Sequence, residues 1–144
     1  MVQVTRTFTA RVEQRAAVAY LRDFANATEW DPGSVSNVQT TDGPVGTGTV
    51  WHNTSSFGGA TPELDYTLVR DDPDHVRFEG TNSSTDTADD IAIRDLGDGR
   101  SEITYTATIR PKGAWRLGAP IFWVLFQRIA GETVASMTRS LEKL

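Results

Sequence analysis

Large apolar side chains recur at steps of three and four positions through residues 119–144. This spacing places them on one face of an α-helix. The apolar face comprises Trp123, Phe126, Ala130, Val134, Met137, Leu141 and Leu144. The opposite face carries Arg128, Glu132, Arg139 and Lys143. The pattern predicts one long C-terminal helix that packs on another layer, since burying each large side chain is worth roughly 1.5–3 kcal/mol.

The first turns of this helix have a different pattern. Residues 121–126 are apolar on every side, and Ile129 extends this region. A helix that is apolar all round is buried on every side or borders an internal space. The start of the helix is therefore expected to be fully buried or to line a cavity.

The N-terminal half begins with a strand and two short helices. Residues 1–12 alternate apolar and polar side chains, with Arg6 interrupting the buried set, which predicts a strand with one buried face. Residues 13–24 carry apolar side chains at helical spacing, and a second short helix over 25–30 is stopped by Asp31-Pro32-Gly33. From Ser34 onward the period changes to two, which predicts six antiparallel strands before the final helix.

The turns between these strands predict which residues face one another. A three-residue loop at Gly97-Asp98-Gly99 pairs Ile93 with Ile103, Ile91 with Tyr105 and Asp89 with Ala107. An even loop at residues 57–60 pairs Trp51 with Tyr66 and Asn53 with Leu64, and directs His52 outward. A three-residue loop at Asp71-Asp72-Pro73 pairs Leu68 with Val76 and Tyr66 with Phe78, and directs Asp65, Arg77 and Glu79 outward. The first of these registers carries Asp89 and Thr87 onto the inward face.

The order of strand, two short helices, six strands and long helix is an α+β arrangement. It resembles the helix-grip fold, a seven-stranded antiparallel sheet curved around a long C-terminal helix. The chain is similar to the polyketide cyclase/dehydrase and lipid transport group of the START-like (SRPBCC, Bet v 1-like) superfamily. The segments that carry the resemblance are residues 12–21 (VEQRAAVAYL), Asp23-Phe24 leading to Glu29-Trp30-Asp31-Pro32, residues 43–48 (GPVGTG) and the closing helix. The resemblance implies a deep, mostly apolar cavity for lipids, sterols, polyketides or other hydrophobic small molecules.

Length and composition limit the other classes of function. The 144 residues fit one domain over 1–144. A net charge of −5 without a basic cluster argues against nucleic-acid binding. The absence of cysteine excludes disulfides and thiolate chemistry, and the alternating N-terminus reads as a strand and not a signal peptide, so we expect a cytoplasmic protein.

Several residues are candidates for the ligand site. A few convergent polar groups in an apolar pocket orient a ligand. The predicted polar groups are Asn53, Tyr66, Asp89 and Tyr105, the predicted apolar contacts are Trp51, Trp123, Phe126 and Ala130, and the predicted cavity entrance is Trp30 and Ile121. A buried Asp89 with a raised pKa is a hypothetical acid catalyst, although no motif identifies a catalytic residue.

The two histidines do not point to a metal site. His52 and His75 belong to different strands and have no third ligand at metal spacing, so we expect no metal and no cofactor. His52 is expected to be a solvated strand residue, and His75, beside Asp74, an exposed turn residue.

These observations favour a binding or carrier protein for a hydrophobic small molecule. The first alternative is a polyketide aromatase or cyclase, which the family resemblance supports. The second is an interaction module in which the apolar helix start, residues 121–125, binds a partner or a second copy. Burial of the same segment inside the protein is favoured over its contact with a membrane. The expected state is a monomer or a homodimer.

Overall fold

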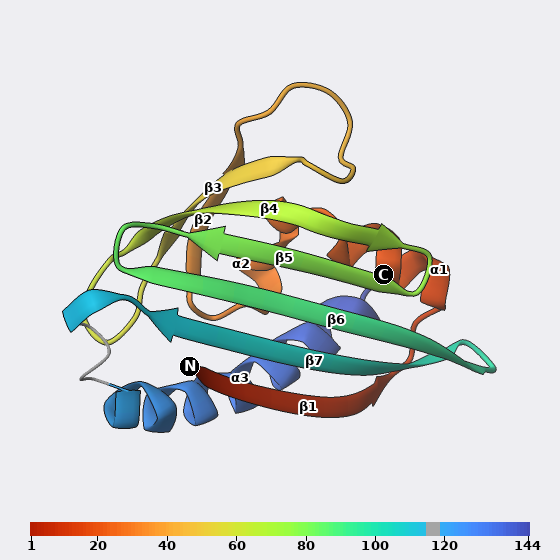
Figure 1. Ribbon diagram of the computed structural model, residues 1–144. Coiled ribbons are helices and arrows are strands. Elements are labelled where there is room, and N and C mark those ends of the chain that lie inside the picture. The colour runs from red at the N-terminus through yellow and green to blue at the C-terminus, as the bar shows by residue number, and fades with distance from the viewer. Residues whose placement is uncertain (115–118) are drawn as a thin grey trace.

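The computed structural model is an antiparallel sheet curved around a long helix, which is the helix-grip fold (Figure 1). It describes residues 1–114 and 119–144, and the side chains of residues 119–122 lie outside this description. In the described residues seven strands form one sheet in the order β1-β7-β6-β5-β4-β3-β2. The elements are β1 (Val2–Ala10), α1 (Gln14–Leu21), the 3-10 helix η1 (Phe24–Asn26), α2 (Ala27–Trp30), β2 (Ser34–Gln39), β3 (Val50–Ser55), β4 (Glu63–Asp72), β5 (His75–Thr81), β6 (Thr85–Gly97), β7 (Arg100–Pro111) and α3 (Ala119–Glu142).

The strand registers confirm two of the three predicted hairpins. β6 and β7 pair Ile93 with Ile103, Ile91 with Tyr105 and Asp89 with Ala107. β3 and β4 pair Trp51 with Tyr66 and Asn53 with Leu64.

The predicted register of β4 and β5 is wrong by two residues. Leu68 pairs with Phe78, and Tyr66 pairs with Gly80. The paired residues nearest the turn are Asp72 and His75. A bulge between Leu68 and Arg70 adds one extra residue to β4. Because a shift of two residues preserves the face, Tyr66 still points inward.

The helix α3 is divided into two parts. Its second half packs on the sheet and on α2, and its buried side chains are Ala130, Thr133, Met137 and Leu141. At its two ends Trp123 is 54% exposed and Leu144 is 59% exposed, so the buried stripe predicted from the sequence is too long. In Figure 1 the first turns of α3 extend beyond the start of β1. Val124 is exposed as well, so the described start of the helix is not buried on every side.

The two helical segments after α1 are held to the sheet by aromatic side chains. Phe24 of η1 stacks on Tyr66 with ring centroids 4.4 Å apart and contacts Phe78 at 4.7 Å. It also contacts Trp30 and Trp51 at 6.2 and 6.1 Å. Asp23 begins η1 by accepting a hydrogen bond from the Ala25 N–H. The aromatic cluster therefore fixes the end of α2, and with it the turn that starts at Asp31.

Gly80 permits the close approach of Tyr66 to β5. A Cβ atom at this position would lie 2.6 Å from Thr87 Oγ1 and 2.7 Å from Tyr66 Cε1. Both distances are shorter than van der Waals contact. In contrast, Gly131 in α3 is exposed and has open space where its Cβ would be.

These two glycines predict opposite effects of the same substitution. Gly80→Ala should lower the free energy of unfolding by about 1–3 kcal/mol because it forces Tyr66 and Thr87 apart. Gly131→Ala should raise it by up to about 1 kcal/mol because alanine is the better helix former. Urea unfolding of both variants measures these changes, and a stable Gly80→Ala protein would contradict the packing described for Tyr66.

Candidate functional site

The inner face of the sheet and the first half of α3 line a cavity of about 540 Å³. The sheet contributes the start of β4 and β6 and the end of β7, and the loop after β3 closes one side. The apolar part of the lining includes Phe57, Leu64, Ala107, Ile109, Leu125, Phe126 and Ile129. The polar part includes Asp31, Tyr66, Thr87, Asp89 and Tyr105. An apolar cavity with a few polar groups is the usual form of a small-molecule site.

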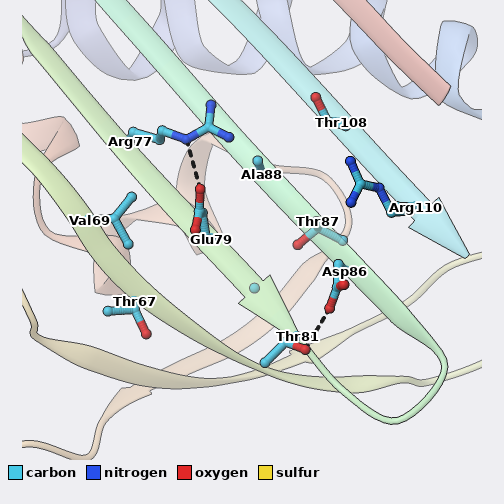
Figure 2. Close-up of a pocket in the computed structure, with 11 residues that line it drawn as sticks. Thr67, Val69, Arg77, Glu79, Thr81, Asp86, Thr87, Ala88, Thr108 and Arg110 are labelled. Atoms are coloured by element: carbon cyan, nitrogen blue, oxygen red, sulfur yellow. Dashed lines mark hydrogen bonds and ion pairs between the residues drawn. The ribbon is translucent and has the colours of Figure 1, made fainter. Parts of the chain in front are cut away.

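A second hollow, of about 510 Å³, lies on the outer face of the sheet (Figure 2). Within it Arg77 pairs with Glu79, and Asp86 pairs with Lys112 beside it. Arg77 contacts Glu79 at 3.1 Å and Asp90 at 3.4 Å, and Thr81 donates to Asp86 at 2.7 Å. The lining of the outer hollow is much less apolar than that of the inner cavity, so the inner cavity is the candidate site.

Asp89 is the central polar group of the cavity. Alternation along β6 directs it inward, where it is 8% exposed and accepts a hydrogen bond of 2.5 Å from the Tyr105 hydroxyl. The pKa of Asp89 is raised to about 7, chiefly by burial and then by repulsion from Asp31, while the Tyr105 hydrogen bond and Arg77 oppose the shift. Asp89 therefore exchanges its proton near neutral pH.

The two cavity tyrosines are neutral hydrogen-bonding groups. Burial raises the pKa of both Tyr66 and Tyr105 well above the ordinary value, and the nearby Asp89 adds to each shift. Thr87 donates a hydrogen bond of 3.1 Å to the Tyr66 hydroxyl oxygen. The hydroxyl proton of Tyr66 is thus left for another acceptor.

Asp31 is a site residue that the sequence did not identify. It follows α2 directly, and its carboxylate accepts from the Gly33 N–H at 3.0 Å and from the Ser34 hydroxyl at 2.9 Å. Burial raises the pKa of Asp31 above its ordinary value. In the sequence its position before Pro32-Gly33 marks it as a turn residue, and no local signal indicates that the turn borders a cavity.

Sequence reasoning also missed several apolar residues of the lining. Leu125 and Ile129 of α3 and Ala107 of β7 line the cavity. The signal for the helix residues was present, because they belong to the segment that is apolar on too many sides. Ala107 was paired correctly with Asp89 in the predicted register, so its inward direction was also available.

The structure brings together four of the predicted site residues and separates the others. Tyr66, Asp89, Tyr105 and Phe126 line the cavity. Trp51 and Ala130 are buried in the core away from the lining, and Trp123 points to solvent. Asn53 is fully buried and its side chain bonds Ser34, Asn37 and Ser55.

The predicted entrance residues are not at an entrance in the described structure. Trp30 is fully buried and packs edge-on against Tyr105, with ring centroids 6.0 Å apart. Trp30 therefore belongs to the core. This placement corrects the prediction that Trp30 lies at the cavity entrance. The side chain of Ile121 lies outside the described residues.

Both histidines lie outside the cavity. His52 points outward as predicted and bonds Glu63 at 2.8 Å and Asp65 at 2.9 Å. These two hydrogen bonds raise the pKa of His52 above its ordinary value. His75 is half-buried, with Nε2 2.9 Å from Asp90, and so is less exposed than expected. Within the described residues, no group of three or more His, Cys, Asp and Glu side chains is arranged to hold a metal ion.

Two substitutions should move the pKa of Asp89 in opposite directions. Tyr105→Phe removes a hydrogen bond that favours the ionised carboxylate, so the pKa should rise above about 7. Asp31→Asn removes a nearby negative charge, so the pKa should fall. The measurement is a carbon-13 NMR titration of the Asp89 carboxyl. Asp42→Asn, on an exposed loop, is the control and should cause no shift; shifts of one sign in both site variants would contradict this electrostatic description.

The fold has close structural relatives despite low sequence identity. A START superfamily protein from Mycobacterium smegmatis has a TM-score of 0.81 at 10% identity, covering 98% of this chain and 97% of that chain. Zhui aromatase/cyclase from a Streptomyces species has a TM-score of 0.80 at 12% identity, covering 98% and 93%. A protein from Thermus thermophilus has a TM-score of 0.75 at 14% identity, covering 98% and 94%. At these identities the similarity establishes the fold.

Two further comparisons and the helices of the structure bear on the class of protein. Comparison with curated protein sequences gives no match. In the described residues, the helices are all too short or too polar to cross a membrane. The family profile for polyketide cyclase/dehydrase and lipid transport matches residues 1–144. The chain therefore belongs to the polyketide cyclase/dehydrase and lipid transport family.

Proposed function

We propose that the protein binds or carries a hydrophobic small molecule in the cavity between the sheet and α3. The observation that supports this most directly is the largely apolar cavity of about 540 Å³ next to a well-packed core. Protein interiors are normally close-packed, and a space of this size leaves its lining without contacts. An apolar ligand would supply these contacts and remove its own surface from water, at roughly 25 cal/mol per Å² buried.

The polar groups at one end of the cavity would fix the orientation of such a ligand. Asp89 and Tyr105 face the interior from β6 and β7, and Tyr66 faces it from β4. The opposite wall is Leu125, Phe126 and Ile129 of α3. A ligand with an apolar body and one polar end matches this division, which agrees with the range of lipids and polyketides in the family name.

Filling the cavity should abolish binding of a neutral hydrophobic probe. N-phenyl-1-naphthylamine should bind with enhanced fluorescence, and Ile129→Trp should weaken its binding at least about tenfold by occupying the space. Val124→Trp is the matched control, since Val124 is on the same helix but 63% exposed. Circular dichroism verifies that both variants fold, and equal binding by the two would contradict a ligand site in this cavity.

A second candidate function is an aromatase or cyclase activity on a polyketide. The observation that favours it is Asp89, because a buried carboxyl with a pKa of about 7 next to Tyr105 suits general acid catalysis. The protonated carboxyl would donate to a substrate oxygen during ring closure. The cavity would hold the reactive chain in a folded conformation.

If this activity exists, Asp89→Asn should lower kcat at least about a hundredfold, because general acid catalysis contributes about 10²–10⁴. In the wild type, kcat should fall as the pH rises through about 7, since the acid must be protonated. The assay follows cyclisation of a poly-β-ketone thioester by absorbance. Turnover that is unchanged in both Asp89→Asn and Tyr105→Phe would exclude these roles, while probe binding could remain intact.

A further inference from the structure

The charged side chains that line the cavity are all acidic among the described residues. Among the described residues that line it, Asp31 and Asp89 carry carboxyl groups, and none is Lys, Arg or His. An anionic headgroup placed among them would lose its hydration without gaining a cationic partner. The lining therefore discriminates between ligands by the charge of their polar ends.

The hydrogen bonds of the two carboxylates distinguish their roles. Both oxygens of Asp31 are occupied, one by the Gly33 N–H and the other by the Ser34 hydroxyl. Asp89 accepts from Tyr105 through Oδ1 alone, and its Oδ2 has no partner among the described residues. This oxygen belongs to a side chain that is more than nine-tenths buried and faces the cavity. Asp89 lines the cavity and its Oδ2 accepts no hydrogen bond from the described residues, so this oxygen is available to a ligand donor.

We infer that the cavity selects ligands whose polar end donates a hydrogen bond and carries no negative charge, such as an amine, an alcohol or a phenol. The inference rests on the proposed binding function and narrows its ligand class. Carboxylates, phosphates and sulfates with the same apolar body bind more weakly because of Asp31 and Asp89. The donor of the ligand meets Asp89 Oδ2, and its apolar body lies against α3.

The charged groups around Asp89 do not provide a counter-ion within the cavity. Asp31 approaches from the turn after α2, and the neutral Tyr66 and Tyr105 flank Asp89 from β4 and β7. Arg77 of β5 lies on the outer face, where Glu79 and Asp90 pair with it. Arg6 of β1 donates to Gln127 of α3. Selection against anions is thus a property of the lining and persists on both sides of neutral pH.

Because Asp89 gains or loses a proton near neutral pH, the affinity for a ligand depends on pH. The direction of the change differs with the charge of the ligand's polar end. As pH rises through about 7, Asp89 becomes ionised and the cavity gains a negative charge. An ammonium end then binds more tightly, and an anionic end binds more weakly. An alcohol changes least, because it donates to the carboxylate and can accept from the protonated acid.

A matched series of decylamine, decanol and decanoate tests the inference by displacement of N-phenyl-1-naphthylamine. At pH 8.5 decanoate should bind at least about tenfold more weakly than decanol. From pH 6 to pH 8.5 the affinity for decylamine should rise by up to about tenfold, and the affinity for decanoate should fall. Asp89→Asn should remove both pH trends.

Asp90→Asn is the matched control for this substitution. Asp90 is the next residue on β6 but lies on the outer face, where it pairs with His75 and Arg77. Asp90→Asn and Asp89→Asn change the net charge equally. The pH trends should therefore persist in Asp90→Asn if they arise inside the cavity. Decanoate that binds as tightly as decanol would overturn the inference, and so would trends lost equally in both variants. Displacement by none of the three ligands would also overturn it while leaving the binding function intact, whereas failure of the probe itself to bind would contradict that function.

Discussion

The burial of Phe24 is the interaction on which the rest of the structure depends. Its ring contacts four other aromatic rings, which come from α2, β3, β4 and β5. Aromatic pairs of this kind add about 0.5–1.5 kcal/mol beyond the area that they bury. The cluster attaches the short helical segments to the sheet and fills one part of the interior of the fold. It therefore determines where the packed core ends and the open cavity begins, and it holds Asp31 at that boundary.

Much of this arrangement could be predicted from the sequence because it depends on period and turn length. Alternation along the strands places Tyr66, Asp89 and Tyr105 on one face, and the fold class follows from the order of elements. Even the wrong register between β4 and β5 left Tyr66 on the correct face, since the error was an even number of residues. The division of α3 into a packing half and a cavity half was likewise visible in its apolar pattern.

The remaining features could not be predicted because periodicity gives the face of a residue and not its depth along the element. Asn53 and Trp51 point inward as expected, yet one closes a polar network with β2 and the other joins the aromatic cluster. Trp123 has the spacing of a core residue, but it lies where α3 extends past the sheet. Asp31 enters the site from a turn, and only the packing of Phe24 and Trp30 brings that turn to the cavity.

The buried Asp89 links the stability of the fold to the occupancy of the cavity. Its pKa is higher in the folded chain, so the folded state binds more protons than the unfolded state between about pH 4 and 7. The free energy of unfolding therefore falls as the pH rises through this interval, and above it the ionised carboxylate is a standing penalty. A ligand donor at Oδ2 favours the ionised form and offsets that penalty. If the cavity binds a ligand as proposed, the group that lowers the stability of the protein above neutral pH is thus the one that would couple ligand binding to stability.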